Sequence, residues 1–63
     1  MGEKGFRVVR EPECEERSGL SRVQRWRLAK EGLFPKPIRL GKRSSGWLDD
    51  ELQNWITERA AQR

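Results

Sequence analysis

Two prolines with one residue between them, Pro35 and Pro37, divide this chain into two parts that fold differently. Each proline restricts the residue before it to extended conformations, so this segment cannot be helical. After it, residues 38–40 alternate as a strand, residues 41–46 form a Gly-bounded basic tip, and residues 47–48 return as a second strand. The sequence therefore predicts a β-hairpin with a cationic end.

Before the prolines, the sequence predicts two helices joined by a tight turn. A proline suits the first turn of a helix, where its missing N–H costs nothing, and the first helix is expected over residues 12–17. Ser21 is followed three residues later by Gln24, which is the capping-box pattern. A second helix is therefore expected from Ser21 as its N-cap to about residue 31. Residues 18–20 then form the turn of a helix-turn-helix.

The two ends of the chain complete the expected fold. Residues 6–9 are β-prone and are expected as a strand at the edge of the sheet. A final helix is expected after Asp49 or Asp50, either of which can serve as its cap. The i, i+3, i+4 and i+8 positions of this helix form one apolar face. They are Leu52, Trp55, Ile56 and Ala60.

The predicted fold is a small α+β winged helix-turn-helix, with three helices and a small β-hairpin wing. It occupies residues 6–60 as one domain, and residues 1–5 and 61–63 are expected to fray. The chain has 63 residues, of which 33% are hydrophobic, so its core is small. A core of this size leaves little material for an enzyme pocket, and we expect no catalytic activity.

The residue types exclude several kinds of site. A single cysteine allows no internal disulfide, and without histidine a zinc site has too few ligands. Cys14 is instead expected to face inward as a small hydrophobic residue. We expect neither a metal nor a cofactor. No apolar run has the length of a membrane span and no signal-peptide core occurs, so we expect a soluble cytoplasmic protein.

Basic charge is concentrated in the middle of the sequence. Residues 21–47 contain eight basic side chains and one acidic one, a net charge of +7, and both flanking segments are net acidic. A run of charge is usually a solvated surface. A strongly basic block between acidic flanks is, however, the electrostatic pattern of a polyanion-binding site. We favour the second interpretation.

The second helix offers the residue types that major-groove recognition needs. On a helical wheel drawn at 100° per residue, the outward face of this helix carries cationic and amide side chains. An Arg side chain can form two hydrogen bonds with guanine, and a Gln side chain can form two with adenine. The alternative is a solvated helix face. Arg25 lies in the inward arc, so either its stem packs while its head reaches solvent, or the helix is slightly rotated. The candidate DNA-binding residues of this helix are Arg22, Val23, Gln24, Arg25, Arg27 and Lys30.

The tip of the hairpin is a second candidate DNA-binding surface. A loop of this kind can follow a phosphate backbone or enter the minor groove, and the alternative is a solubilising loop. Its candidate residues are Lys42, Arg43, Ser44 and Ser45. The three tryptophans, Trp26, Trp47 and Trp55, could stack on unpaired bases, but packing in the core is the favoured role for all three.

Residues 18–56 resemble the AlpA family of prophage regulators, which is related to MerR-type winged helices and to phage excisionases. The matching residues are 18–22, 30–41, 46–48, 52 and 55–56. The resemblance implies a winged helix-turn-helix that binds DNA near integrated mobile elements. Its members switch genes, or act as recombination directionality factors that bend attachment DNA for an integrase. By position, the resemblance places Arg22, Gln24 and Arg27 on the recognition helix and residues 42–44 on the wing.

We therefore expect a sequence-specific DNA-binding protein of a phage or mobile element, associated with the nucleoid. Its expected partner is double-stranded DNA, an integrase is a further candidate partner, and one recognition helix per chain favours cooperative assembly on repeated sites. The main alternative is a small adaptor that binds an integrase or another protein through the acidic first and third helices. An RNA-binding module is a weaker alternative, because it would need exposed aromatic side chains for stacking.

Overall fold

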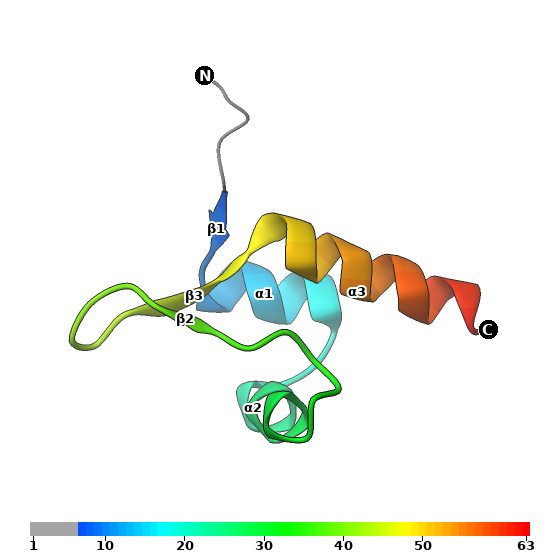
Figure 1. Ribbon diagram of the computed structural model, residues 1–63, viewed down its shortest axis with the longest axis horizontal. Coiled ribbons are helices and arrows are strands. Elements are labelled where there is room, and N and C mark those ends of the chain that lie inside the picture. Colours follow the sequence, from blue (N-terminus) through cyan, green and yellow to red (C-terminus); the bar gives the residue numbers. More distant parts are fainter. Residues whose placement is uncertain (1–6) are drawn as a thin grey trace.

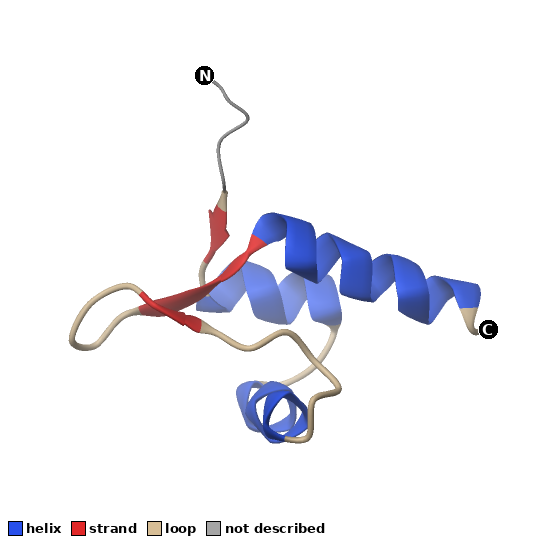
Figure 2. Ribbon diagram, viewed as in Figure 1, coloured by secondary structure: helices blue, strands red, loops and turns tan. Residues whose placement is uncertain are grey.

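Three helices pack at one end of a small sheet, whose β2–β3 hairpin projects away from them, in the computed structural model, which describes residues 7–63 (Figure 1). Figure 2 shows α1 and α3 lengthwise and α2 end-on, so α2 crosses the other two helices steeply. The fold is the small α+β winged helix-turn-helix that the sequence predicts. The elements are β1 (Val8–Val9), α1 (Glu11–Ser18), α2 (Arg22–Lys30), β2 (Ile38–Arg39), β3 (Ser45–Leu48) and α3 (Asp49–Ala61).

β3 is the central strand of the sheet, which has the order β1-β3-β2 and is antiparallel throughout. Val9 lies opposite Trp47, and Ile38 lies opposite Gly46. β1 is therefore at an edge, as predicted, although residue 6 and the predicted frayed residues 1–5 lie outside the described part of the chain. We call residues 38–48, which comprise β2, the tip and β3, the wing.

The tip of the wing is shorter than predicted. β2 ends before Leu40, and β3 begins at Ser45 rather than at Trp47. The N–H of Leu40 donates a hydrogen bond to the carbonyl oxygen of Ser44 at 2.8 Å, which closes the loop. Ser45 and Gly46 pair with β2 and therefore belong to β3. The strand was predicted to begin at the apolar residue Trp47, but its pairing begins two residues earlier.

The turn between α1 and α2 forms as the local sequence predicts. Gly19 caps α1 with a φ of +75°, a left-handed conformation that glycine adopts without strain, and its N–H donates to the carbonyl of Glu15 at 2.9 Å. At the start of α2, the Ser21 hydroxyl accepts a hydrogen bond from the Gln24 N–H at 3.2 Å. The Gln24 side chain accepts one in return from the Ser21 N–H at 3.0 Å. The predicted capping box is confirmed.

The start of α3 differs from the prediction. Leu48 occupies the N-cap position without a side-chain hydrogen bond, and Asp49 is the first helical residue. The Asp49 carboxylate instead accepts a hydrogen bond from the guanidinium of Arg17 on α1. The prediction that Asp49 or Asp50 caps this helix was wrong, because Asp49 pairs with a cation of another helix.

The core is small and joins all three helices to the sheet. Leu52 is its buried residue on α3, Trp55 and Ile56 are half-buried, and Ala60 is exposed, so the predicted apolar face is buried only near its start. Trp26 is 38% exposed, which contradicts the prediction that all three tryptophans pack in the core. Within residues 7–63, no helix has the length and apolar character that a membrane crossing needs. The buried hydrophobic residues are Val9, Cys14, Ala29, Phe34, Trp47 and Leu52.

Gly46 is expected to be intolerant of any side chain. A Cβ atom there would lie 2.6 Å from a methyl group of Val8 and 3.0 Å from the carbonyl oxygen of Val9. Overpacking of this kind costs about 1–3 kcal/mol, so Gly46→Ala should lower the urea midpoint of unfolding. Gly41→Ala is the matched control, because a Cβ atom there meets Ser44 only at 4.0 Å. Equal midpoints for the two variants would contradict the close approach of β1 to β3.

Candidate nucleic-acid interface

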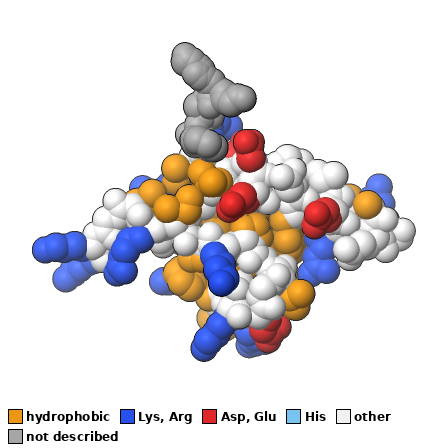
Figure 3. All heavy atoms as spheres, viewed as in Figure 1, with side chains coloured by type: hydrophobic (Ala, Val, Ile, Leu, Met, Phe, Trp, Pro, Cys, Tyr) orange, Lys and Arg blue, Asp and Glu red, His pale blue; other side chains and the backbone are white. Residues whose placement is uncertain are grey.

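Seven basic side chains are exposed on α2, on the wing and on the segment that joins them. Figure 3 shows Lys and Arg side chains gathered over the tip of the wing and over α2, whereas most of the visible Asp and Glu side chains lie over α3. The basic block of the sequence is thus displayed where α2 and the wing meet. We call these residues the basic surface: Arg22, Arg27, Lys30, Lys36, Arg39, Lys42 and Arg43.

A hollow between α2 and the wing brings one predicted residue of α2 together with the predicted residues of the wing. Arg22 enters it from α2, and all four predicted wing residues line it from the other side. Arg27 and Lys30 line a neighbouring hollow together with Lys36. Guanidinium, ammonium and hydroxyl groups are donors for phosphate oxygens and for the acceptors at base edges. The full lining of the first hollow is Arg22, Trp26, Pro37, Arg39, Lys42, Arg43, Ser44 and Ser45.

Gln24 is less available for base recognition than the sequence suggests. Its side-chain oxygen already accepts the Ser21 N–H in the capping box, which bends the amide back toward the start of α2. Paired recognition of adenine needs this oxygen as well as the amide N–H₂. Val23, the residue before it, is 67% exposed and makes no such internal contact.

Arg25 does not belong to the exposed surface, and its burial contradicts the prediction that it contacts DNA. Its side chain is 0% exposed, so neither the expected exposed head nor a rotated helix describes it. Its Nη2 donates to Glu11 Oε1 on α1 at 2.6 Å, and its Nε donates to the carbonyl of Leu20 at 3.1 Å. The guanidinium carbon also lies 5.2 Å from the centre of the Trp47 ring. Arg25 therefore joins α2 to α1, to the turn and to β3.

The Arg25–Glu11 pair has a clear electrostatic effect. The hydrogen bond from Arg25 holds the pKa of the Glu11 carboxyl below its usual value, against the opposing effect of burial. The hydrogen bond from Arg17 lowers the pKa of Asp49 in the same way. Both carboxylates are thus charged at neutral pH, and each fixes a cation between two elements. These contacts orient α2 and α3 relative to α1.

Trp26 is a surface residue that sequence reasoning missed. It lines both hollows, and its ring packs edge-on against buried Trp47 with 6.3 Å between ring centres. The guanidinium carbon of Arg22 lies 5.7 Å from the centre of the Trp26 ring. On the helical wheel Trp26 stands at the border of the inward arc, and this border position was the available signal.

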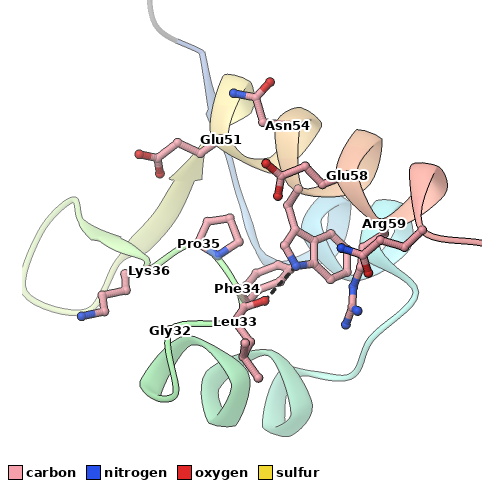
Figure 4. A pocket seen from close by; sticks show the side chains of 11 residues that line it. Gly32, Leu33, Phe34, Pro35, Lys36, Glu51, Asn54, Glu58 and Arg59 are labelled. Atoms are coloured by element: carbon pink, nitrogen blue, oxygen red, sulfur yellow. Dashed lines mark hydrogen bonds between the residues drawn. The ribbon is translucent and has the colours of Figure 1, made fainter.

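A further groove lies between α3 and residues 32–36 and adjoins the basic surface at Lys36 (Figure 4). Its charged lining residues are of both signs: Lys36, Glu51, Glu58 and Arg59. The indole N–H of Trp55 donates to the carbonyl of Leu33 at 2.9 Å and ties the two walls together. The mixed charge gives this groove no preference for a polyanion. In residues 7–63, no three His, Cys, Asp or Glu side chains are grouped so that they could hold a metal ion.

Comparisons with known proteins agree with this geometry. Residues 7–60 match the family model described as prophage CP4-57 regulatory protein (AlpA). The chain is also 37% identical over 57 residues to the uncharacterized protein ORF88 of Enterobacteria phage P4. That match covers 90% of this chain and 65% of the relative's length. The chain therefore belongs to the AlpA family of prophage regulatory proteins.

Proposed function

We propose that this chain binds duplex DNA, with α2 in the major groove and the wing on the neighbouring phosphates. The observation that supports this most directly is the shared hollow, where Arg22 of α2 meets Lys42 and Arg43 of the wing. A recognition helix contacts base edges near its N-terminal end. Arg22 and Val23 are the first two residues of α2, and both are exposed.

The chain belongs to a prophage regulatory family, and a regulatory role is consistent with contact between α2, the wing and duplex DNA. Regulation of transcription and control of recombination both require that the protein occupies a defined stretch of DNA. One recognition helix reads only a few base pairs, so we further propose that specificity is increased by cooperative binding to repeated sites or by an integrase bound beside the chain. Regulation of transcription and control of recombination depend on the same contact with duplex DNA, which the salt dependence of binding tests.

The affinity for duplex DNA is expected to depend steeply on salt. If about five to seven phosphates are neutralised, the logarithm of the binding constant falls with the logarithm of salt concentration at a slope of about −4 to −6. The affinity then drops roughly a thousandfold between 50 and 200 mM salt. Fluorescence anisotropy of a labelled duplex over this range measures the slope directly. A slope near zero would remove the electrostatic basis of the proposal.

A charge-matched pair of variants separates position from net charge. Arg27→Gln with Arg43→Gln removes two cations of the basic surface, and the slope should become less steep by about two. Arg59→Gln with Arg63→Gln removes the same charge from α3 and the C-terminal end, outside the basic surface, and should leave the slope nearly unchanged. Arg22 is not altered, because it also lies near Glu11 and Trp26. Equal slopes for the two double variants would favour the adaptor alternative, in which DNA affinity is non-specific.

A further inference from the structure

Two apolar side chains interrupt the basic surface on α2. Val23 is 67% exposed and Trp26 is 38% exposed, and they are three residues apart, which places them on neighbouring turns of one helix face. We call this pair the apolar strip. Arg22, Arg27 and Lys30 of the same helix flank it, and Pro37 lines both hollows beside Trp26.

The apolar strip is held in place rather than free to collapse onto the core. The Trp26 ring forms a T-shaped pair with Trp47, which is 1% exposed, and the Arg22 guanidinium lies over the Trp26 ring. Trp26 lines the hollow toward the wing and the hollow toward Lys36. A fixed apolar surface therefore occupies the centre of the region where the cations gather.

The charge around the apolar strip selects its occupant. The cations favour a polyanion, and the apolar strip favours a polyanion that also carries apolar groups. Duplex DNA meets both conditions, because its major groove displays the C5-methyl group of each thymine to a bound helix. Hydrogen-bond recognition by the amide of Gln24 is restricted by the capping box, so apolar contact by Val23 stands beside Arg22 as a source of discrimination at the start of α2. Such a contact with thymine rests on the proposed function and extends it to a particular chemical group.

We propose that Val23 and Trp26 contact thymine methyl groups in the major groove and make the DNA preference of this chain depend on them. Val23 is the second residue of α2, in the part of a recognition helix that reaches base edges. Trp26 follows one turn later and extends the contact along the groove. Arg22, Arg27 and the wing cations hold the flanking phosphates.

The test replaces thymine with deoxyuridine, which removes the methyl group and leaves the hydrogen-bonding edge unchanged. Duplexes are first selected from a random pool by the whole chain, and each thymine of a selected duplex is then replaced in turn. Burial of one methyl group corresponds to an affinity change of about fourfold. At one or two positions we therefore expect a loss of about threefold to fivefold, with no loss elsewhere.

Variants of the apolar strip assign the effect to its residues. Val23→Ala removes an exposed side chain and raises helix propensity, so the variant should stay folded and lose the deoxyuridine effect at one position. Trp26→Ala should lose it at the neighbouring position, with circular dichroism to confirm that α2 persists. Leu33→Ala, at a residue that is 57% exposed outside the basic surface, is the control and should respond like the unaltered chain.

The outcomes separate this inference from the function on which it rests. Failure to enrich any duplex from the pool would overturn the proposed function and the inference together. Enrichment of duplexes that tolerate every deoxyuridine would overturn the inference alone. If Val23→Ala and Trp26→Ala bind the selected duplexes as the unaltered chain does, with the same deoxyuridine effects, the strip is free of DNA and serves a protein partner instead. Loss of the methyl effect in the strip variants only would establish the contact.

Discussion

Glu11→Ala is expected to lower the free energy of unfolding by about 3–5 kcal/mol, although the Glu11 side chain is 34% exposed. The substitution removes the counter-ion of Arg25, which is fully buried and whose Nη1 already finds no hydrogen-bond partner among residues 7–63. A buried charge without a partner is neither hydrated nor neutralised, and this is why the loss is large. A domain of 63 residues is stable by only about 3–9 kcal/mol in total. The loss is therefore a large share of the total stability, and at the low end of this range it unfolds the variant.

The matched variants show which part of the pair causes the loss. Glu13→Ala also removes an acidic residue from the first turn of α1, but among residues 7–63 Glu13 pairs with Arg17 alone, near the surface, so less than about 1 kcal/mol is expected. Arg25→Met keeps an apolar side chain in the core but leaves the Glu11 carboxylate, whose Oε2 is buried, without its cation. The double variant Glu11→Ala with Arg25→Met should recover most of the lost stability. Urea unfolding followed by tryptophan fluorescence measures all four proteins, and a double variant no more stable than Glu11→Ala would contradict the argument.

The pH dependence of stability is a second readout of the same ion pair. The pKa of Glu11 is lowered in the folded state, mainly by its hydrogen bond from Arg25. Its contribution is therefore fully present above the unfolded pKa and is lost as the pH falls through the folded pKa. Arg25→Met should be less sensitive to acid than the unaltered chain. Asp49 keeps its partner Arg17 in both proteins, so the difference between them reports Glu11.

Local features of the fold could be predicted because their causes lie within a few residues. The capping box joins Ser21 to Gln24, and the turn depends on the left-handed conformation of Gly19. The helical wheel also placed Arg25 correctly on the inward face of α2. Its partner could not be predicted, because Glu11 lies 14 residues away on another helix, and only the packing of α1 against α2 brings them together.

The errors at Asp49 and Trp26 have the same physical origin. Asp49 has the sequence context of a helix cap, but Arg17, 32 residues earlier, competes for its carboxylate. Trp26 is apolar and borders the inward arc, yet Trp47 of β3 already fills the space behind it. The candidate site, too, depends on contacts between residues that are distant in the sequence. Its residues could be named from the charge pattern, whereas the hollow that unites Arg22 with the wing depends on how α2 and β3 pack.

Trp47→Ala is expected to cost about 3–5 kcal/mol of unfolding free energy, because it empties the centre of a small core. Trp47 is 1% exposed, and its indole N–H donates to the carbonyl of Pro35 at 3.1 Å. Trp47→Phe keeps an aromatic ring and removes this hydrogen bond, which leaves the Pro35 carbonyl without its partner. A smaller loss of about 1–3 kcal/mol is expected for that variant. Thermal unfolding by circular dichroism distinguishes the two, and equal losses would assign the whole effect to the hydrogen bond.

Trp55→Ala is the control that separates stability from DNA binding. Trp55 also packs on an aromatic ring, with 4.8 Å between its ring centre and that of Phe34, and also donates to a backbone carbonyl. Trp47, however, contacts both Arg25 and Trp26, and so it sets the position of α2 relative to the wing. In sucrose, which strengthens burial and keeps destabilised variants folded, Trp47→Phe should bind a selected duplex more weakly than Trp55→Ala does. Equal affinities for the two folded variants would mean that Trp47 supports the core without positioning the recognition helix.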